Sequence, residues 1–392
     1  MKKLLSQCFL LLALIPCFNS CTDLHSAAGD GDIATITRLI SKGKNVNQPK
    51  KNGWTPLHYA ASYGSEEAAK TLIAAGATVN QTDEFARTSL HYAAMNGYTE
   101  IAKTLIAAGA SVNPSAEAGW TPLHYAARYG HAEVARVLIA SKANVHQVTN
   151  ESWAPLHYAA YYGHAGVVQV LIASKANIHQ VKNDGWTAMY LAAASGHTEV
   201  VRALIAAGAS INQADKYGFT ALHLAAREGK AGVARLLIAS HANVNLVNNN
   251  GWTPLHLAAW NNYSEIVNAL IAAGAYVNGT NNEGKSPLQL ANEKDYKDIA
   301  RTLIAAGANV NAPGKNGNTM LHEAAANGDY LLVQTLINRG ANLHAVNNNN
   351  KTAMELAQDA LYRMNPESVL YLFESGKYKE IIKMLQRAGA RY

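Results

Sequence analysis

Cysteine is absent from most of this chain. The three cysteines among its 392 residues are Cys8, Cys17 and Cys21, and none follows Cys21. This distribution excludes a disulfide framework, a cysteine nucleophile and a cysteine-ligated zinc site from the later residues. Charge is scarce as well, because Asp, Glu, Lys and Arg make up 15% of the chain and its net charge is +6. That excess is too weak and too dispersed to indicate a nucleic-acid-binding surface.

Catalytic motifs are also missing. The sequence has no H-E-x-x-H, no G-x-S-x-G and no Walker loop. Acidic residues are scattered, and no paired arrangement recurs. We therefore expect no catalytic residues, no cofactor and no metal, and hence no enzyme.

The first 21 residues have the layout of an export signal. Lys2 and Lys3 precede an apolar run of 11 residues, from Cys8 to Phe18, which ends in Asn19, Ser20 and Cys21. A basic segment, a short apolar core and small or polar residues are typical of a secretory signal peptide. A transmembrane helix needs about 20 apolar residues, so we predict a signal peptide over residues 1–20.

Cys21 resembles the lipidated cysteine of a bacterial lipobox, with the small Ser20 before it. Phe18 departs from that pattern, because an aliphatic residue is usual there, and it suits ordinary signal-peptidase cleavage equally poorly. Lipidation of Cys21, cleavage to a soluble exported protein and an uncleaved anchor therefore all stay open. By the lipoprotein resemblance, Thr22 in place of Asp favours the outer membrane over the inner membrane. We expect an exported protein in the periplasm or on the outer membrane, with secretion as the alternative.

One stretch returns every 33 residues. Residues 55–61 read TPLHYAA, and residues 88–94 and 121–127 read TSLHYAA and TPLHYAA. The register is set by His25, His58, His91, His124, His157, Tyr190, His223, His256, Gln289, His322 and Glu355. The chain thus resembles the ankyrin-repeat family, whose signature is T-P-L-H-x-A at this period. The resemblance implies an all-α solenoid of about 11 helix-turn-helix units, caps included, joined by β-hairpin-like loops.

The repeats divide the chain. We predict an N-terminal capping unit over residues 22–49, nine full repeats over residues 50–346 and an altered C-terminal unit over residues 347–392. Within a repeat, Thr-Pro opens the first helix, a glycine ends it, and the second helix ends at Gly-Ala. Lys142, Lys175 and His241 stand in that last glycine position, where we expect a left-handed conformation at a cost of about 1 kcal/mol. In the last unit we expect an inserted helix after Asn365, then a closing helix over residues 377–387.

Fifteen histidines suggest metal binding, but their spacing opposes it. Equivalent histidines in stacked helices lie about 10 Å apart, too far to share one zinc ion with bonds near 2 Å. The family resemblance implies that the motif histidine bonds backbone groups of neighbouring loops instead. His131, His164 and His197 follow the interhelix glycine, a place where the family often has histidine.

Aromatic residues concentrate just before the motif threonine, a variable position of the family's concave face. This column holds Trp54, Arg87, Trp120, Trp153, Trp186, Phe219, Trp252, Lys285, Asn318 and Lys351, and so contains five of the six tryptophans. Trp260 and several tyrosines lie near the end of the first helix. Two interpretations stay open and are compatible: the rings pack on the adjacent hairpin, or they line a groove for a partner.

We therefore expect a non-catalytic, monomeric scaffold that binds a protein or peptide in an aromatic-rich groove, and that touches a membrane only through its lipid anchor. The candidate partner-binding residues are Trp54, Trp120, Tyr129, Trp153, Tyr162, Trp186, Phe219, Trp252 and Trp260. Arg128 and Arg227 are possible carboxylate contacts in the same zone. Two other functions stay open: an envelope protein that supports a stress-defence enzyme, and a secreted effector that binds host proteins.

Overall fold

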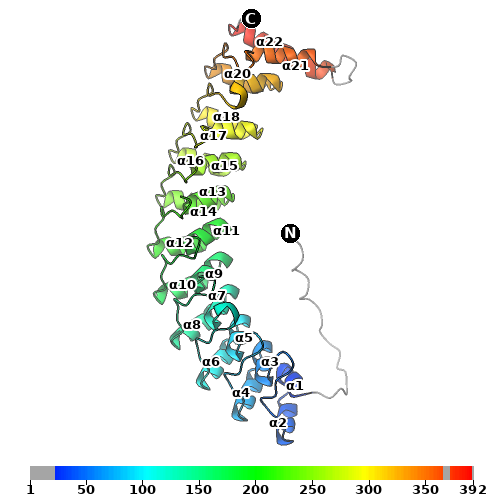
Figure 1. Cartoon of the computed structure of the whole chain (residues 1–392), viewed down its shortest axis with the longest axis vertical. Helices are drawn as coiled ribbons and strands as arrows, with labels where there is room; N and C mark the ends of the chain where they lie inside the picture. The colour runs from blue at the N-terminus through cyan, green and yellow to red at the C-terminus, as the bar shows by residue number, and fades with distance from the viewer. Residues whose placement is uncertain (1–22, 365–370, 391–392) are drawn as a thin grey trace. The chain divides into compact units, whose positions relative to one another are not determined.

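A computed structural model describes residues 23–364 and 371–390, in which pairs of helices alternate with loops (Figure 1). The predicted signal peptide and Cys21 lie outside the described residues. The chain divides into two compact units, residues 1–150 and 151–392, which we describe separately. The described residues contain no β-strand, and their loops carry the hairpin-like bonds discussed below. The expectation of an all-α solenoid is confirmed within each unit.

The first unit contains eight α-helices and one 3-10 helix in its described part. They are α1 (Leu24–Asp30), α2 (Ile33–Ser41), α3 (Pro56–Tyr63), α4 (Glu66–Ala74), α5 (Ser89–Asn96), α6 (Thr99–Ala107), η1 (Glu117–Gly119), α7 (Pro122–Tyr129) and α8 (Ala132–Ala140). Odd-numbered helices pack on one another, as α1 does on α3 and α5 on α7, and even-numbered helices form a parallel layer.

The second unit continues the same alternation. Its helices are α9 (Pro155–Tyr162), α10 (Ala165–Ala173), α11 (Ala188–Ser195), α12 (Thr198–Ala206), α13 (Ala221–Arg227), α14 (Ala231–Ala239), α15 (Pro254–Trp260), α16 (Ser264–Ala272), α17 (Pro287–Glu293), α18 (Lys297–Ala305), η2 (Lys315–Gly317), α19 (Met320–Ala326), α20 (Tyr330–Asn338), α21 (Ala353–Tyr362) and α22 (Tyr371–Arg387). No helix in the described part of the chain is long and apolar enough to cross a bilayer.

Helix ends follow the local sequence. Thr55 caps α3, Pro56 occupies its first turn, and Gly64 ends it with a φ of 84°, a conformation that glycine adopts without the steric cost of a Cβ. Lys142, Lys175 and His241 adopt the left-handed conformation expected at the end of the second helices, with φ of 71°, 61° and 64°.

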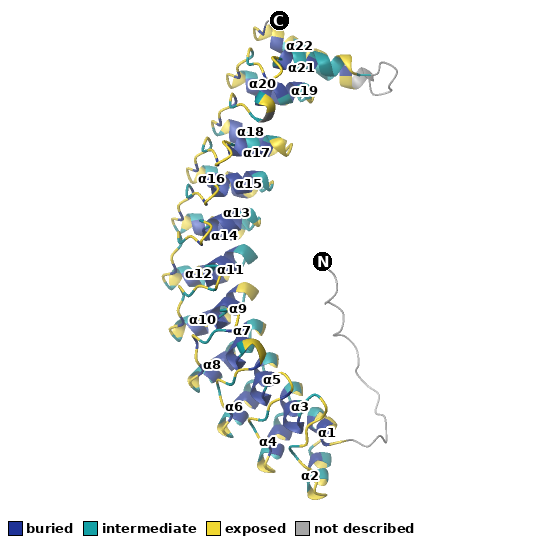
Figure 2. Cartoon of the chain, in the orientation of Figure 1, coloured by how far each residue is buried: buried dark blue, intermediate teal, exposed yellow. Residues whose placement is uncertain are grey.

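The core of each unit lies between the two helix layers (Figure 2). Small Ala-Ala pairs of the first helices, such as Ala60 and Ala61, are completely buried, and so are leucines of the second helices, such as Leu72 and Leu105. Because alanine keeps the first helices thin, neighbouring repeats approach closely and their leucines fill the space between the layers.

The C-terminal unit differs from the expectation of two helices. A single helix, α22, covers Tyr371–Arg387 and includes Gly376 in its interior, so no break separates an inserted helix from a closing one. Glycine inside a helix costs about 1 kcal/mol, and buried Ile381 and Leu385 anchor the following turns. The proposed helix start at Asn365 lies outside the described residues.

Candidate functional site

The motif threonine and histidine form a buried capping box at the start of most first helices. In α3, the Thr55 N–H donates to His58 Nδ1 at 3.1 Å, and Thr55 Oγ1 lies 2.8 Å from the same nitrogen. Because Nδ1 accepts, the imidazole proton sits on Nε2, which donates to the Arg87 carbonyl of the next repeat at 3.1 Å. One side chain thus caps its own helix and binds the following hairpin.

The same connection recurs along both units. His Nε2 lies 3.2 Å from the Trp120 carbonyl for His91, 3.0 Å from Trp252 for His223, 3.2 Å from Lys285 for His256 and 2.9 Å from Lys351 for His322. Burial lowers the pKa of His91, His157, His223 and His256 to about 4. These histidines are therefore neutral structural groups, as the family resemblance implied.

Other histidines connect repeats in the opposite direction. His131 and His197 bond the carbonyls of Met95 and Tyr161 in the preceding repeat, at 3.0 and 2.9 Å. Among the described residues, no group of three or more His, Cys, Asp or Glu side chains is placed to hold a metal ion.

Five of the hairpin-like loops hold their column residue in place through an acidic or amide side chain four residues earlier, namely Asp83, Asp215, Asn248, Asn281 and Asn347. Asp215 Oδ1 accepts from the N–H groups of Tyr217 and Phe219, both at 2.9 Å, and the Asp215 N–H bonds the Phe219 carbonyl at 2.8 Å. Asn248 holds Trp252 in the same way. The column side chains therefore project from a fixed backbone.

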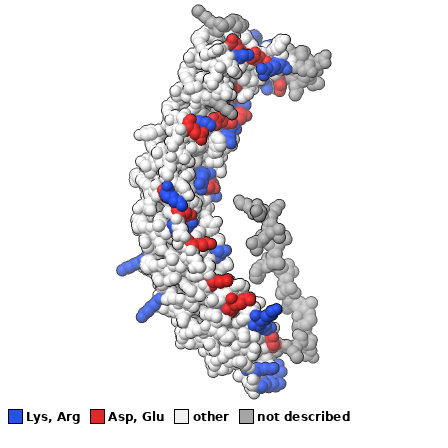
Figure 3. All heavy atoms as spheres, in the orientation of Figure 1, with Lys and Arg blue, Asp and Glu red and all other residues white. Residues whose placement is uncertain are grey.

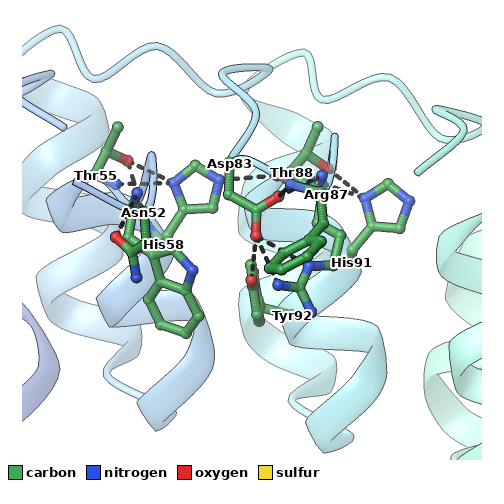
Figure 4. A network of polar contacts seen from close by, with 10 residues as sticks. Asn52, Thr55, His58, Asp83, Arg87, Thr88, His91 and Tyr92 are labelled. Carbon is green, nitrogen blue, oxygen red and sulfur yellow. Dashed lines mark hydrogen bonds and ion pairs between the residues drawn. The ribbon is translucent and has the colours of Figure 1, made fainter. Parts of the chain in front are cut away.

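Arg87 interrupts the aromatic column and is held internally (Figure 4). Its Nε and Nη2 both lie 2.9 Å from Asp83 Oδ2, which also accepts from the Tyr92 hydroxyl at 2.5 Å. Burial of Asp83 acts to raise its pKa, but the hydrogen bonds from Tyr92 and Arg87 outweigh this and hold the pKa below its usual value. Trp54 packs on Tyr92 at 4.4 Å between ring centroids, so this part of the column is a closed network.

The column tryptophans are half-buried, and part of their surface packs against other side chains of the chain. Trp54, Trp120 and Trp153 lie 5.2, 4.9 and 4.8 Å from the motif tyrosines Tyr59, Tyr125 and Tyr158 of their own repeats. These three rings therefore pack on the first helix of their own repeat and are only partly buried. Packing on the adjacent hairpin and binding of a partner both stay predictions.

A pairing that the sequence analysis missed joins several column residues to the residue eight positions later, at the end of the first helix. Trp153 meets Tyr161 edge-on at 5.7 Å, and Trp252 meets Trp260 at 5.9 Å. Arginine takes the second place elsewhere, with the Arg128 guanidinium 5.6 Å from Trp120 and that of Arg227 5.3 Å from Phe219. An i, i+8 search along the sequence would have found this recurrence.

The candidate residues differ in their neighbours. Trp252 and Trp260 contact each other. Tyr129 lies beside Arg128 at 5.7 Å, while Tyr162 packs on Tyr161 at 5.0 Å and on His164 at 6.3 Å. Tyr129, Tyr161 and Tyr162 are exposed, at 45%, 43% and 38%. The sequence reading singled out Tyr162 for the partner list, and Tyr161 is the tyrosine that contacts Trp153.

Lys182 connects two successive tryptophans. Its Nζ lies 5.4 Å from the Trp153 ring and 5.6 Å from the Trp186 ring, and it forms an ion pair with Asp184. The Trp186 indole N–H also donates to Asp215 Oδ2 at 3.2 Å. Trp186 is thus tied to the loops on both sides, and its loss would disturb these loops as well as any binding surface.

Beyond Trp260 the same positions change character. Lys285 pairs with Glu293 at 3.0 Å, and Lys351 pairs with Asp359, so an ion pair replaces the aromatic pair at the i, i+8 positions. Burial, and then the nearby Glu293 carboxylate, raise the pKa of Glu323. Glu323 occupies the position of the motif tyrosine, where a charge is poorly solvated.

This architecture defines a class of protein: a helical-repeat scaffold whose repeats share their helix caps and core and differ at surface positions, among them the column and the adjoining helix ends. The sequence profile described as ankyrin repeats (3 copies) matches overlapping segments that together cover residues 3–314, and the profile described as ankyrin repeats (many copies) matches residues 303–357. The chain therefore belongs to the ankyrin-repeat family. Such repeats generally mediate protein–protein interactions and are typically non-enzymatic.

One solved structure shows the extent of the likeness. The human ASB11 ankyrin repeat domain is 29% identical, with a TM-score of 0.52, over 56% of this chain and 98% of that domain. No curated protein matches the chain.

Proposed function

We propose that this chain is a non-catalytic scaffold that binds a partner protein or peptide through the aromatic surface of its second unit. We define this aromatic surface by Trp153, Tyr161, Phe219, Trp252 and Trp260. The observation that carries the proposal is that these rings lie in pairs at variable repeat positions and remain partly exposed, outside the core that holds the repeats together. Tryptophan and tyrosine in such positions supply large contact areas and dominate binding hot spots.

The binding test compares aromatic residues inside and outside the proposed binding surface. Capture of partners by the parent chain is compared with capture by the Trp252→Ala/Trp260→Ala double variant. Tyr276→Ala is the control, because Tyr276 is 68% exposed and lies after a second helix, away from the column. We expect the double variant to lose its partner and the control to keep it; unchanged capture by the double variant would show that the aromatic pairs only pack.

We further propose that the scaffold is exported and held on a membrane by a lipid on Cys21. The basic, apolar and small-residue order of residues 1–21 supports this proposal. Labelling with a radioactive fatty acid should mark the parent chain and not the Cys21→Ala variant. Equal labelling of both chains would refute the anchor without affecting the binding proposal.

A further inference from the structure

The N-terminal capping unit, with the loop that follows it, has more basic residues than the equivalent part of any later repeat. Five positions at the end of α2 and in the loop after it are basic, namely Arg38, Lys42, Lys44, Lys50 and Lys51. None of the nine later repeats has more than one basic residue at the five equivalent positions, where Ala, Ser, Thr and Asn predominate. Residues 33–65 also contain no Asp or Glu. This group of basic residues is therefore a local departure from the repeat pattern.

Arg38, Lys44 and Lys50 line an open hollow, and Lys42 and Lys51 lie close to these residues in the sequence. Figure 3 shows Lys and Arg atoms gathered at this end of the molecule. The hollow measures about 680 Å³, and its wall combines Leu24, Leu39 and Pro49 with Lys44 and other basic residues. In later repeats the position of Lys44 is an alanine that the preceding repeat buries, as for Ala77 at 8% exposure. No described repeat covers this face of the first one.

Acidic neighbours do not cancel this charge. Asp23 pairs with Lys50 at 2.8 Å, but Arg38, Lys42, Lys44 and Lys51 form no ion pair with any residue that the structure describes. Asp32 caps the start of α2 and interacts electrostatically with Arg38. The end of α2 lies about 13 Å from that start at a rise of 1.5 Å per residue, beyond the screening length of about 8 Å at physiological ionic strength, so Asp32 offsets the charge at that end only weakly.

We infer that this basic end, defined by Arg38, Lys42, Lys44 and Lys51 around the hollow, docks on anionic phospholipid headgroups. Cationic side chains next to a membrane attachment point add to the binding of an anionic surface. The proposed lipid site, Cys21, precedes Asp23 on the rim of the hollow by two residues, a span of at most about 7 Å. The inference thus rests on the proposed anchor for its placement, and it adds a second membrane contact to the one expected from sequence.

Vesicle binding of the full chain tests the inference. All variants carry Cys21→Ala, so that no acyl chain contributes. The test variant adds Lys42→Gln, Lys44→Gln and Lys51→Gln; the control adds Lys379→Gln, Lys383→Gln and Arg387→Gln on α22, which removes the same charge from exposed positions. Each protein is sedimented with phosphatidylcholine vesicles, with and without phosphatidylglycerol, at low and high salt, and its melting curve verifies folding.

We expect the parent to bind vesicles with phosphatidylglycerol at least about tenfold better than pure phosphatidylcholine, with the difference lost at high salt. The α2-loop variant should lose that preference, and the α22 variant should keep it. Equal behaviour of the two variants, or no preference in the parent, would overturn the inference. Partner capture by the tryptophan variants is a separate measurement, so failure of either proposal can be recognised independently.

Discussion

Two regions of the second unit share one backbone plan and differ in their surface side chains. In three of the four repeats from Trp153 to Trp260, the column residue and the residue eight positions later form an aromatic or cation–aromatic pair. In two of the three repeats from Lys285 to Asp359, the same positions form an ion pair. The capping residue differs as well: Gln289 and Glu355 replace histidine beside His322 in the second region, whereas only Tyr190 does so in the first. The difference shows that the frame tolerates either chemistry, so the aromatic region is not required by the fold.

Acid should destabilise the aromatic region more than the charged region, where only His322 keeps the capping histidine with a lowered pKa, and we expect this to be the largest effect. The depressed pKa values of His157, His223 and His256 stabilise the aromatic region above pH 6.5, and this stability is lost as the pH falls toward 4. Each pKa unit corresponds to about 1.4 kcal/mol, so the three histidines together cost several kcal/mol.

The raised pKa of Glu323 has the reverse sign: its contribution is lost as the pH rises through that value and regained as the pH falls toward 4.5. Hydrogen exchange at pH 5 and pH 7, corrected for intrinsic rates, should show protection falling more in α13 and α15 than in α17, where Gln289 takes the place of the capping histidine. A uniform loss of protection would contradict the assignment.

Removing a capping histidine should produce the next largest effect. His223 is fully buried and bonds both Thr220 and the Trp252 carbonyl. We expect His223→Ala to reduce the free energy of unfolding by about 3 kcal/mol, because it leaves buried backbone groups unpaired.

His223→Gln sharpens the comparison with the charged region. Gln289 already bonds the Ser286 N–H at 2.8 Å and the Pro313 carbonyl at 2.6 Å, so glutamine can make both connections. The carbonyl that Gln289 reaches lies five residues before the column residue of the next loop, whereas His223 bonds the column carbonyl itself. Because glutamine still caps the helix and bonds the next loop, we expect this variant to lose only about 1 kcal/mol in urea unfolding. Equal losses for alanine and glutamine would show that the ring's packing matters more than its bonds.

The paired positions themselves should differ in their effect on stability. Trp252→Ala removes a half-buried ring that contacts His256 and Trp260, and should cost about 1–2 kcal/mol. Lys285→Ala removes an exposed ion pair and should cost less than about 0.5 kcal/mol. Thermal unfolding of both variants provides the measurement, and a larger loss for Lys285→Ala would refute this account of the two pairs.

The smallest effect should be a gain in stability. Glu323→Leu places in the charged region the residue that α13, α15 and α17 carry at this position, as Leu224, Leu257 and Leu290. It removes a partly buried carboxylate next to Glu293, and should stabilise the chain by about 0.5–1 kcal/mol at pH 7. A destabilised variant would indicate that the Glu323 carboxylate has a favourable partner.

The sequence predicted the structural features that recur from repeat to repeat, and it missed the side-chain contacts that vary between repeats. Thr55, Pro56 and Gly64 determine the ends of α3 by local capping, and the left-handed conformation of Lys142 followed from its place in the repeat. The i, i+8 pairs, and the position of Lys182 between two tryptophans, depend on side-chain directions of two elements. The continuous α22 was missed because packing of Ile381 and Leu385 outweighs the local cost of Gly376.

Photo-crosslinking at equivalent positions of the two regions tests the central claim most directly. A benzoylphenylalanine replaces Tyr161 in one variant and Asp359 in another, since both are the eighth residue after their column residue. In cells that produce the chain, we predict a discrete partner adduct from position 161 and none from position 359. Adducts of equal yield, or an adduct from position 359 alone, would contradict the assignment of partner binding to the aromatic region.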